Sequence, residues 1–202
     1  MAMKKIVTKL LVKFGDIYFK NKKENPTEIN RILIIAPIGI GDVLMITPAI
    51  KALRNKFPKS VIIDCLVHEW SKEVLQDNLY INKILVNNKI YKNHNLFQLN
   101  KEAKKYKNYD CAVIFSQLFL PIFAYLCNIP IRIGYDKNGE GFALTRKLKF
   151  TGKKHKIDIN LDIVKLLGAR TINKKMHFFF KDKSVKLEKN TIGFCVGGGV
   201  NP

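Results

Sequence analysis

The chain has 202 residues, 47% of them hydrophobic, and its 36 lysines and arginines against 16 aspartates and glutamates give a net charge of +20. This length and apolar content allow a domain of about 150 residues to bury about 70% of its unfolded surface, which is ample for an independent core. The four cysteines stand singly, without a C-x-x-C pair or histidines at zinc spacing, which excludes a common structural zinc site and indicates reduced core residues in a cytoplasmic protein.

Most of the positive charge is lysine spread along the chain. Nucleic-acid binding is expected to combine a basic groove with stacking aromatic residues, and the sequence lacks that combination. Two interpretations of the charge stay open. It is either a solvated surface or an attraction to an anionic membrane or a lipopolysaccharide-type substrate.

Residues 1–30 form a basic segment with apolar residues at helical spacing and a linker at Pro26. Lysines interrupt the apolar runs and no small-residue cleavage site follows, so the segment is not a signal peptide. It is expected either to lie peripherally on a membrane or to pack on the protein's own sheet.

Residues 31–50 hold the most informative pattern of the chain. Residues 32–35 are an unbroken aliphatic run, typical of a strand buried on both faces of a parallel sheet. Gly39 and Gly41 then favour a tight turn, and Asp42 stands at the expected N-cap of the following helix. Asp42 is therefore expected at the carboxyl end of a central strand, where ligands bind in open α/β sheets.

This loop does not fit the common nucleotide-binding motifs. The third glycine of G-x-G-x-x-G is missing, and no Lys-Ser/Thr pair follows for a P-loop. A purely structural alternative stays open, in which Asp42 only caps its helix by accepting hydrogen bonds from free backbone amides. Pro48, inside the same helix, predicts a kink or an irregular early turn.

The whole pattern alternates strands and helices, which predicts an α/β fold with a doubly wound, Rossmann-like parallel sheet. Besides the first strand, strands are expected at residues 60–67, 83–86, 110–116, 131–135 and 191–196, with a short one at 178–180. Helices are expected at residues 42–57, 71–75, 96–106, 119–127 and 157–167. Prolines and polar residues interrupt the apolar stretch 111–131, which therefore predicts a buried strand and a core helix rather than a membrane span.

A glycine run, Gly197, Gly198 and Gly199, follows the last expected strand. Such a loop lets backbone amides approach a phosphate. The alternative is that these glycines are only flexible chain. The expected division is a basic segment at 1–30, a Rossmann-like domain at 31–173, a linker at 174–190, and the start of a second domain at 191–202.

Several segments together resemble glycosyltransferase family 9, which contains the ADP-heptose:lipopolysaccharide heptosyltransferases. The resemblance rests on GDVLMITPAIKALRNKFPKSVIIDCLV within residues 31–67, IRIGY at 131–135, LTR at 144–146 and HKIDINLDIVKLLG at 155–168. Its most specific part is Gly41-Asp42 followed by Thr47-Pro48-Ala49. It extends over about residues 31–202 and implies the N-terminal, acceptor-binding half of a two-domain GT-B architecture.

The resemblance also implies an inverting sugar transfer from a nucleotide-diphosphate sugar to a lipopolysaccharide or other glycan acceptor. Asp42 is the implied general base, and the loop 197–199 is expected to face the donor's diphosphate. Without a D-x-D motif, neither a metal nor another cofactor is expected. The expected location is the cytoplasm, with contact to the inner face of the membrane. The residues expected to contact the acceptor are Gly39, Ile40, Gly41, Gln117 and Arg132.

Four further residues are weaker candidates. His68 and Trp70 follow the second strand and either line the acceptor cleft or pack in the structure, and Arg146 is a possible contact for an acceptor phosphate. His155 is expected to fix a loop rather than to take part in chemistry. A different class of function also stays open, in which a non-catalytic basic domain binds a membrane surface or a polyanion and Asp42 is only a helix cap.

Overall fold

Six parallel strands form the centre of the structure, in the order β3-β2-β1-β4-β5-β6. The computed structural model describes residues 28–92, 96–116, 119–137, 140–170, 173–179 and 189–194. This strand order is that of a doubly wound Rossmann sheet, in which the chain moves outward from β1 in one direction and then in the other. The predicted fold class is confirmed.

The helices and strands have the following bounds. The strands are β1 (Arg31–Ala36), β2 (Ile62–Val67), β3 (Lys83–Val86), β4 (Cys111–Ile114), β5 (Ile131–Asp136) and β6 (Arg146–Lys149). The α-helices are α2 (Ile40–Lys56), α3 (Lys89–Lys92), α4 (Leu96–Ala103), α5 (Leu120–Leu126) and α6 (Lys156–Lys165). Short 3-10 helices occupy Glu69–Leu75, Lys104–Tyr106 and Glu140–Ala143.

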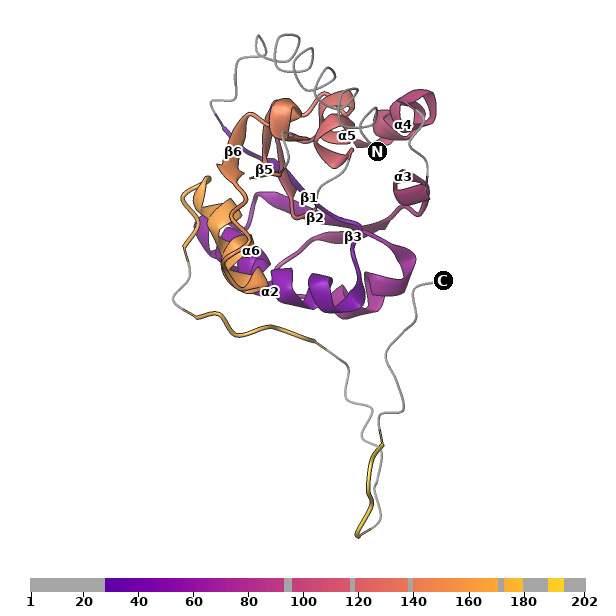
Figure 1. Ribbon diagram of the computed structural model, residues 1–202, viewed down its shortest axis with the longest axis vertical. Helices are drawn as coiled ribbons and strands as arrows, with labels where there is room; N and C mark the ends of the chain where they lie inside the picture. Colours follow the sequence, from indigo (N-terminus) through magenta and orange to yellow (C-terminus); the bar gives the residue numbers. More distant parts are fainter. Residues whose placement is uncertain are drawn as a thin grey trace.

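The central strand β1 is buried on both faces, as its aliphatic run predicts. Ile32 and Ile34 pack in the core beneath α2 and α6, whereas Leu33 and Ile35 pack on the opposite face with residues of α4 and α5. Figure 1 shows the same arrangement, with α2 and α6 on one side of the sheet and α4 and α5 on the other. Alternate side chains of a strand point to opposite faces, so a sheet covered on both sides needs apolar residues at every position.

The structure differs from the sequence-based expectations at three places. The strand β6 was not expected, because two of its four residues are exposed lysines at the edge of the sheet. Residues 178 and 179 form no strand, and residue 180 lies outside the described residues. Residues 191–194 are also irregular, so the strand expected at 191–196 is absent from its described part.

Helix α2 continues through Pro48, which lies in its interior rather than in its first turn. Pro48 has no N–H for the carbonyl oxygen of Leu44, one turn earlier. The buried hydroxyl of Thr47 donates to that oxygen instead, at 2.7 Å, and the same Oγ1 accepts a hydrogen bond from the backbone N–H of His177 at 2.9 Å. Thr47 therefore repairs the helix and also holds the segment 173–179 against it.

Replacing Thr47 with valine keeps the shape of the side chain and removes both hydrogen bonds. We expect Thr47→Val to lower the free energy of unfolding by about 1–3 kcal/mol, since a buried carbonyl and a backbone N–H lose their partner. Thr47→Ser keeps the hydroxyl and should lower the free energy of unfolding clearly less than Thr47→Val does. Equilibrium urea unfolding compares the two variants, and equal losses in both would show that the methyl group, not the hydroxyl, matters.

Some expectations lie outside the described residues or are only partly covered by them. The basic segment at 1–30 falls almost entirely outside, as does Cys195. Cys65, Cys111 and Cys127 are buried, as expected for core residues. In the described part of the chain, no helix has the length and apolar character needed to cross a bilayer.

Candidate functional site

The strand order changes direction between β1 and β4. The chain leaves β1 through α2, on one face of the sheet, and leaves β4 through α5, on the other face (Figure 1). Loops that follow two such neighbouring strands diverge, and the crevice between them is where ligands bind in open α/β sheets. The candidate site is therefore the edge of the sheet just beyond Ala36 and Ile114.

Asp42 lies at this edge, in the first turn of α2. The N-cap residue is Gly39, whose carbonyl oxygen accepts a hydrogen bond from Val43 N at 2.9 Å. The prediction that Asp42 is the N-cap is wrong, because the helix begins at Ile40. Within the described residues no backbone amide donates a hydrogen bond to the side chain of Asp42, so its structural role is reduced to its favourable place at the positive end of the helix dipole.

The carboxylate of Asp42 is accessible. Its side chain is 40% exposed, and its Oδ1 lies 3.6 Å from the Nζ of Lys156, which is itself 41% exposed. An ion pair of this exposure contributes at most about 1 kcal/mol. An incoming polar group can therefore displace the ammonium from the carboxylate at little cost.

Lys156 is the first residue of α6, and its position depends on the packing of α6 against α2. His155 caps α6, because its Nδ1 accepts a hydrogen bond from Ile157 N at 3.3 Å. His155 thus caps a helix, whereas the sequence predicted that it fixes a loop. The buried side chain of Asn160 donates to the carbonyl oxygen of Met45 in α2, at 3.1 Å. The two helices are thus joined close to the site.

A pocket of about 200 Å³ opens beside this pair of residues. Lys156 lines the pocket and also pairs with Asp42, which is not itself among the described residues that line it. The pocket lies beyond the carboxyl ends of β4 and β5 and against α6. Its lining consists of Ile114, Phe115, Ser116, Tyr135, Lys137, Phe150, Lys156, Ile159 and Ile163.

The lining combines two ammonium groups with hydroxyl groups and aromatic faces. The Nζ of Lys137 lies 5.1 Å from the centre of the Phe150 ring, which is cation–π distance. Burial, with the nearby Asp162 as a second cause, raises the pKa of Tyr135 to about 12, so its hydroxyl stays protonated at neutral pH. Such a lining can bind the hydroxyl groups and the apolar face of a sugar, and it favours an anionic substituent.

Gly39 and Gly41 contribute open space rather than an unusual backbone. Gly39 has φ −63°, which any residue adopts, and neither glycine is among the described residues with positive φ. A Cβ atom added at either position would meet no atom within 4 Å. The fold therefore does not require glycine here. The missing side chains leave room next to Asp42.

Arg132 does not belong to the site. It is only 3% exposed, near the amino end of β5, whereas the site lies at the carboxyl edge of the sheet. Its Nε donates to the carbonyl oxygen of Ala143 at 2.6 Å, and its Nη1 donates to the carbonyls of Ile129 and Pro130 at 2.6 and 3.1 Å. The prediction that Arg132 contacts the acceptor is therefore wrong, since its guanidinium is used within the fold.

The weaker candidates are also largely structural. Arg146 begins β6, and its Nη1 donates to the carbonyl oxygen of Leu166 at 3.1 Å. His68 follows β2 and is 3% exposed, with its ring stacked on Trp70 at a centroid distance of 3.3 Å. Trp70 is 43% exposed, so of these three residues it offers the most surface to a ligand.

Other expected site residues are not described by the structure. Gln117 and the loop of Gly197, Gly198 and Gly199 lie outside the described residues, so their roles remain predictions. The structure adds Lys137 and Lys156, which sequence reasoning missed. Lys137 follows the end of β5 and Lys156 begins α6. Many other lysines of this chain also lie at the ends of strands or helices, so the sequence does not single out these two.

Among the described residues, no three His, Cys, Asp or Glu side chains come together as a metal site.

Several solved structures superpose on this chain. A family 9 glycosyl transferase from Veillonella parvula superposes with a TM-score of 0.65 at 18% identity, over 80% of this chain and 48% of that one. This chain shares its Rossmann-like fold with about half of that protein. E. coli ADP-heptose lps heptosyltransferase II gives a TM-score of 0.57 over 66% of this chain and 40% of that one, also at 18% identity.

A further glycosyltransferase structure contains a nucleotide sugar. E. coli heptosyltransferase WaaC with ADP-2-deoxy-2-fluoro heptose has a TM-score of 0.55 at 18% identity, over 69% of this chain and 49% of that one. This chain thus spans about half the length of the glycosyltransferases that it resembles in fold. No protein-family model matches the chain, and no curated protein matches its sequence.

Proposed function

We propose that this chain is the acceptor-binding part of an inverting glycosyltransferase, with Asp42 as the general base. The observation that carries the proposal is an accessible carboxylate at the carboxyl end of the central strand, beside a pocket suited to a sugar. The fold, which is shared with family 9 glycosyltransferases, supports the same conclusion. The donor is a nucleotide-diphosphate sugar, and the acceptor is a lipopolysaccharide or another glycan.

The proposed reaction is a single displacement. The acceptor hydroxyl lies against Asp42, its oxygen forms a bond to the anomeric carbon, and its proton passes to a carboxylate oxygen. The bond from the anomeric carbon to the donor phosphate breaks, and the electron pair leaves with the nucleoside diphosphate. The loop of Gly197, Gly198 and Gly199 is proposed to hold that diphosphate through its backbone amides.

Mass spectrometry of the products tests this function. The protein, as its gene encodes it, is incubated with a panel of nucleotide-diphosphate sugars and a lipopolysaccharide core oligosaccharide. The proposal predicts that one donor raises the mass of the acceptor by one sugar. If no donor of the panel yields a product while a control transferase uses the same acceptor, the proposal fails.

The open space at Gly41 gives a prediction with two effects of opposite sign. Gly41→Ala should raise the free energy of unfolding by up to about 1 kcal/mol, since alanine is the better helix residue and meets no neighbouring atom. The same change should raise the KM for the acceptor, because the methyl group occupies space next to Asp42. Urea unfolding and acceptor kinetics measure the two effects. A more stable variant with unchanged KM would show that the substrate does not use this space.

The net charge of +20 favours one alternative, a non-catalytic domain that binds a membrane surface or a polyanion. In that case anionic vesicles bind the protein as tightly after Asp42→Ala as before, and no sugar is transferred. Product formation that depends on Asp42 decides between the two functions.

A further inference from the structure

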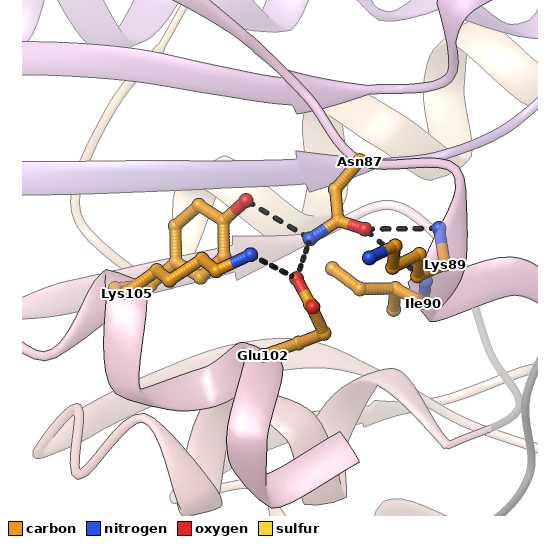
Figure 2. Close-up of polar contacts among 6 residues, drawn as sticks. Asn87, Lys89, Ile90, Glu102 and Lys105 are labelled. Carbon is orange, nitrogen blue, oxygen red and sulfur yellow. Dashed lines mark hydrogen bonds and ion pairs between the residues drawn. The ribbon is translucent and has the colours of Figure 1, made fainter. Parts of the chain in front are cut away.

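A second constellation of polar residues follows β3, at the same edge of the sheet as Asp42. Asn87 comes directly after β3, and its side-chain Nδ2 donates to Glu102 Oε2 at 2.9 Å and to the Tyr106 hydroxyl at 3.1 Å. Its Oδ1 accepts hydrogen bonds from the backbone N–H groups of Lys89 and Ile90, at 2.9 and 3.3 Å. Figure 2 shows Asn87 at the centre of these contacts. Asn87 thereby joins the start of α3 to the last turn of α4.

Glu102 is the chemically unusual member of this network, because it is only 7% exposed. The Nζ of Lys105 donates to its Oε2 at 2.8 Å, the same oxygen that Asn87 contacts (Figure 2). The hydrogen bond from Lys105, working against burial, holds the pKa of Glu102 below its ordinary value, so the group is ionised at neutral pH. Within the described part of the chain, the second oxygen, Oε1, accepts no hydrogen bond.

A pocket of about 360 Å³ includes Glu102 in its wall. This volume lies within the range of small-molecule sites, and the pocket is at the carboxyl edge of β3, where ligands bind in parallel sheets. The other residues of its lining are Lys89, Ile90, Gln98, Leu99 and Lys101. Lys89, Gln98 and Lys101 are exposed, whereas Glu102 is buried, so the carboxylate is at the base and the ammonium groups are at the rim.

This distribution of charge selects one kind of ligand. A simple cation is repelled by the two lysines, and a simple anion that reaches the base is repelled by Glu102. A hydroxylated ligand can donate a hydrogen bond to the carboxylate and use the Gln98 amide, while an acidic group on the same ligand contacts the lysines. We propose that this pocket binds a sugar that carries a phosphate or carboxylate group.

The proposed pocket is independent of Asp42. β3 lies two strands away from β1 in the sheet, and α4 packs on the face opposite to α2. Binding can therefore be measured without any transfer reaction. Binding to this pocket can be absent even if the protein transfers sugar through Asp42, and it can be present even if the protein transfers no sugar.

Isothermal titration of the protein with four probes tests the proposal. Glucose 6-phosphate and glucuronate carry both hydroxyl and acidic groups, whereas glucose and inorganic phosphate each carry one kind. We expect at least one acidic sugar to bind at least about tenfold more tightly than either half-ligand, since the two kinds of contact add. The proposal is overturned if neither acidic sugar binds more tightly than both glucose and inorganic phosphate, or if neither acidic sugar binds at all.

Exposed lysines supply a matched pair of variants. The double variant Lys89→Ala/Lys101→Ala should weaken binding of the acidic sugar at least about tenfold. Lys104→Ala/Lys107→Ala removes the same charge from exposed positions outside the pocket and should leave binding unchanged, as should Asp42→Asn. Equal losses in the two double variants would show attraction by overall charge only and would contradict a specific pocket.

Glu102→Gln tests the base of the pocket. With the repelling charge removed, we expect weaker binding of the acidic sugar and stronger binding of inorganic phosphate, a reversal that loss of structure would not produce. If this variant does not fold, Gln98→Ala, at an exposed position, replaces it in the experiment. Gln98→Ala should weaken binding of the acidic sugar but not binding of inorganic phosphate. Parallel changes for both probes would refute the assigned role of Glu102 or Gln98.

Discussion

Replacing Asp42 with asparagine is expected to lower kcat for sugar transfer by about 10²- to 10⁴-fold, the usual range for a general base. Asparagine keeps the size of the side chain but cannot take the proton of the acceptor hydroxyl. The fold should be unaffected, because the carboxylate is 40% exposed and its ion pair with Lys156 is weak. Initial rates at saturating donor and acceptor, with circular dichroism of the variant, provide the measurement.

Asp77→Asn is the matched control for this experiment. Asp77 is exposed and has φ 58°, a conformation that asparagine also tolerates, so the change alters charge alone. It should transfer sugar at the normal rate. If Asp42→Asn also retains the normal rate, Asp42 is not the base.

Arg132→Met is expected to cost the protein about 3 kcal/mol or more in free energy of unfolding. The guanidinium donates to three carbonyl oxygens, those of Ile129, Pro130 and Ala143, in a region where Arg132 is 3% exposed. Methionine fills much of the same volume but leaves these carbonyls without the donor, and each such loss costs about 1–3 kcal/mol. Equilibrium urea unfolding measures the change.

Arg170→Met, at an exposed position, removes the same charge and should shift the unfolding curve little. The two variants thus separate the loss of charge from the loss of the buried hydrogen bonds. A result in which Arg132→Met kept full stability and raised only the KM for the acceptor would contradict the structural role and restore the sequence-based one.

The fold could be predicted from the sequence to the extent that burial leaves a pattern. The aliphatic run of β1 is visible because both faces of this central strand are covered. The edge strand β3 is visible because its last three residues are aliphatic and half-buried. The edge strand β6 was not predicted, because its alternating exposed lysines resemble the sequence of a polar loop. The start of α2 was misplaced because aspartate is a preferred cap, whereas the structure uses Gly39 without a side-chain cap.

The candidate site could be predicted only where it is local in the chain. Asp42 lies in the first turn of the helix that follows β1, and the loop from a parallel strand to its next helix lies at the carboxyl edge of the sheet. Lys156 comes near Asp42 only through the packing of α6 on α2, which no local pattern reveals. Arg132 was misassigned for the opposite reason. An arginine in a strand suggests a ligand contact, but backbone carbonyls of neighbouring loops satisfy it.

The role of Thr47 could not be predicted from the sequence either. The sequence Thr47-Pro48 indicates a disturbed helix, because proline removes one hydrogen bond. The structure shows that the preceding hydroxyl replaces this bond and also binds the backbone of His177, far along the chain. The pattern that predicts a defect therefore marks a point of attachment.

The stereochemistry of the product tests the central claim most directly. One carboxylate that acts as a base on the acceptor implies direct displacement at the anomeric carbon, without a covalent sugar–enzyme intermediate. We therefore predict that NMR of the product shows the anomeric configuration opposite to that of the donor. Retention of configuration would contradict the single-base mechanism at Asp42.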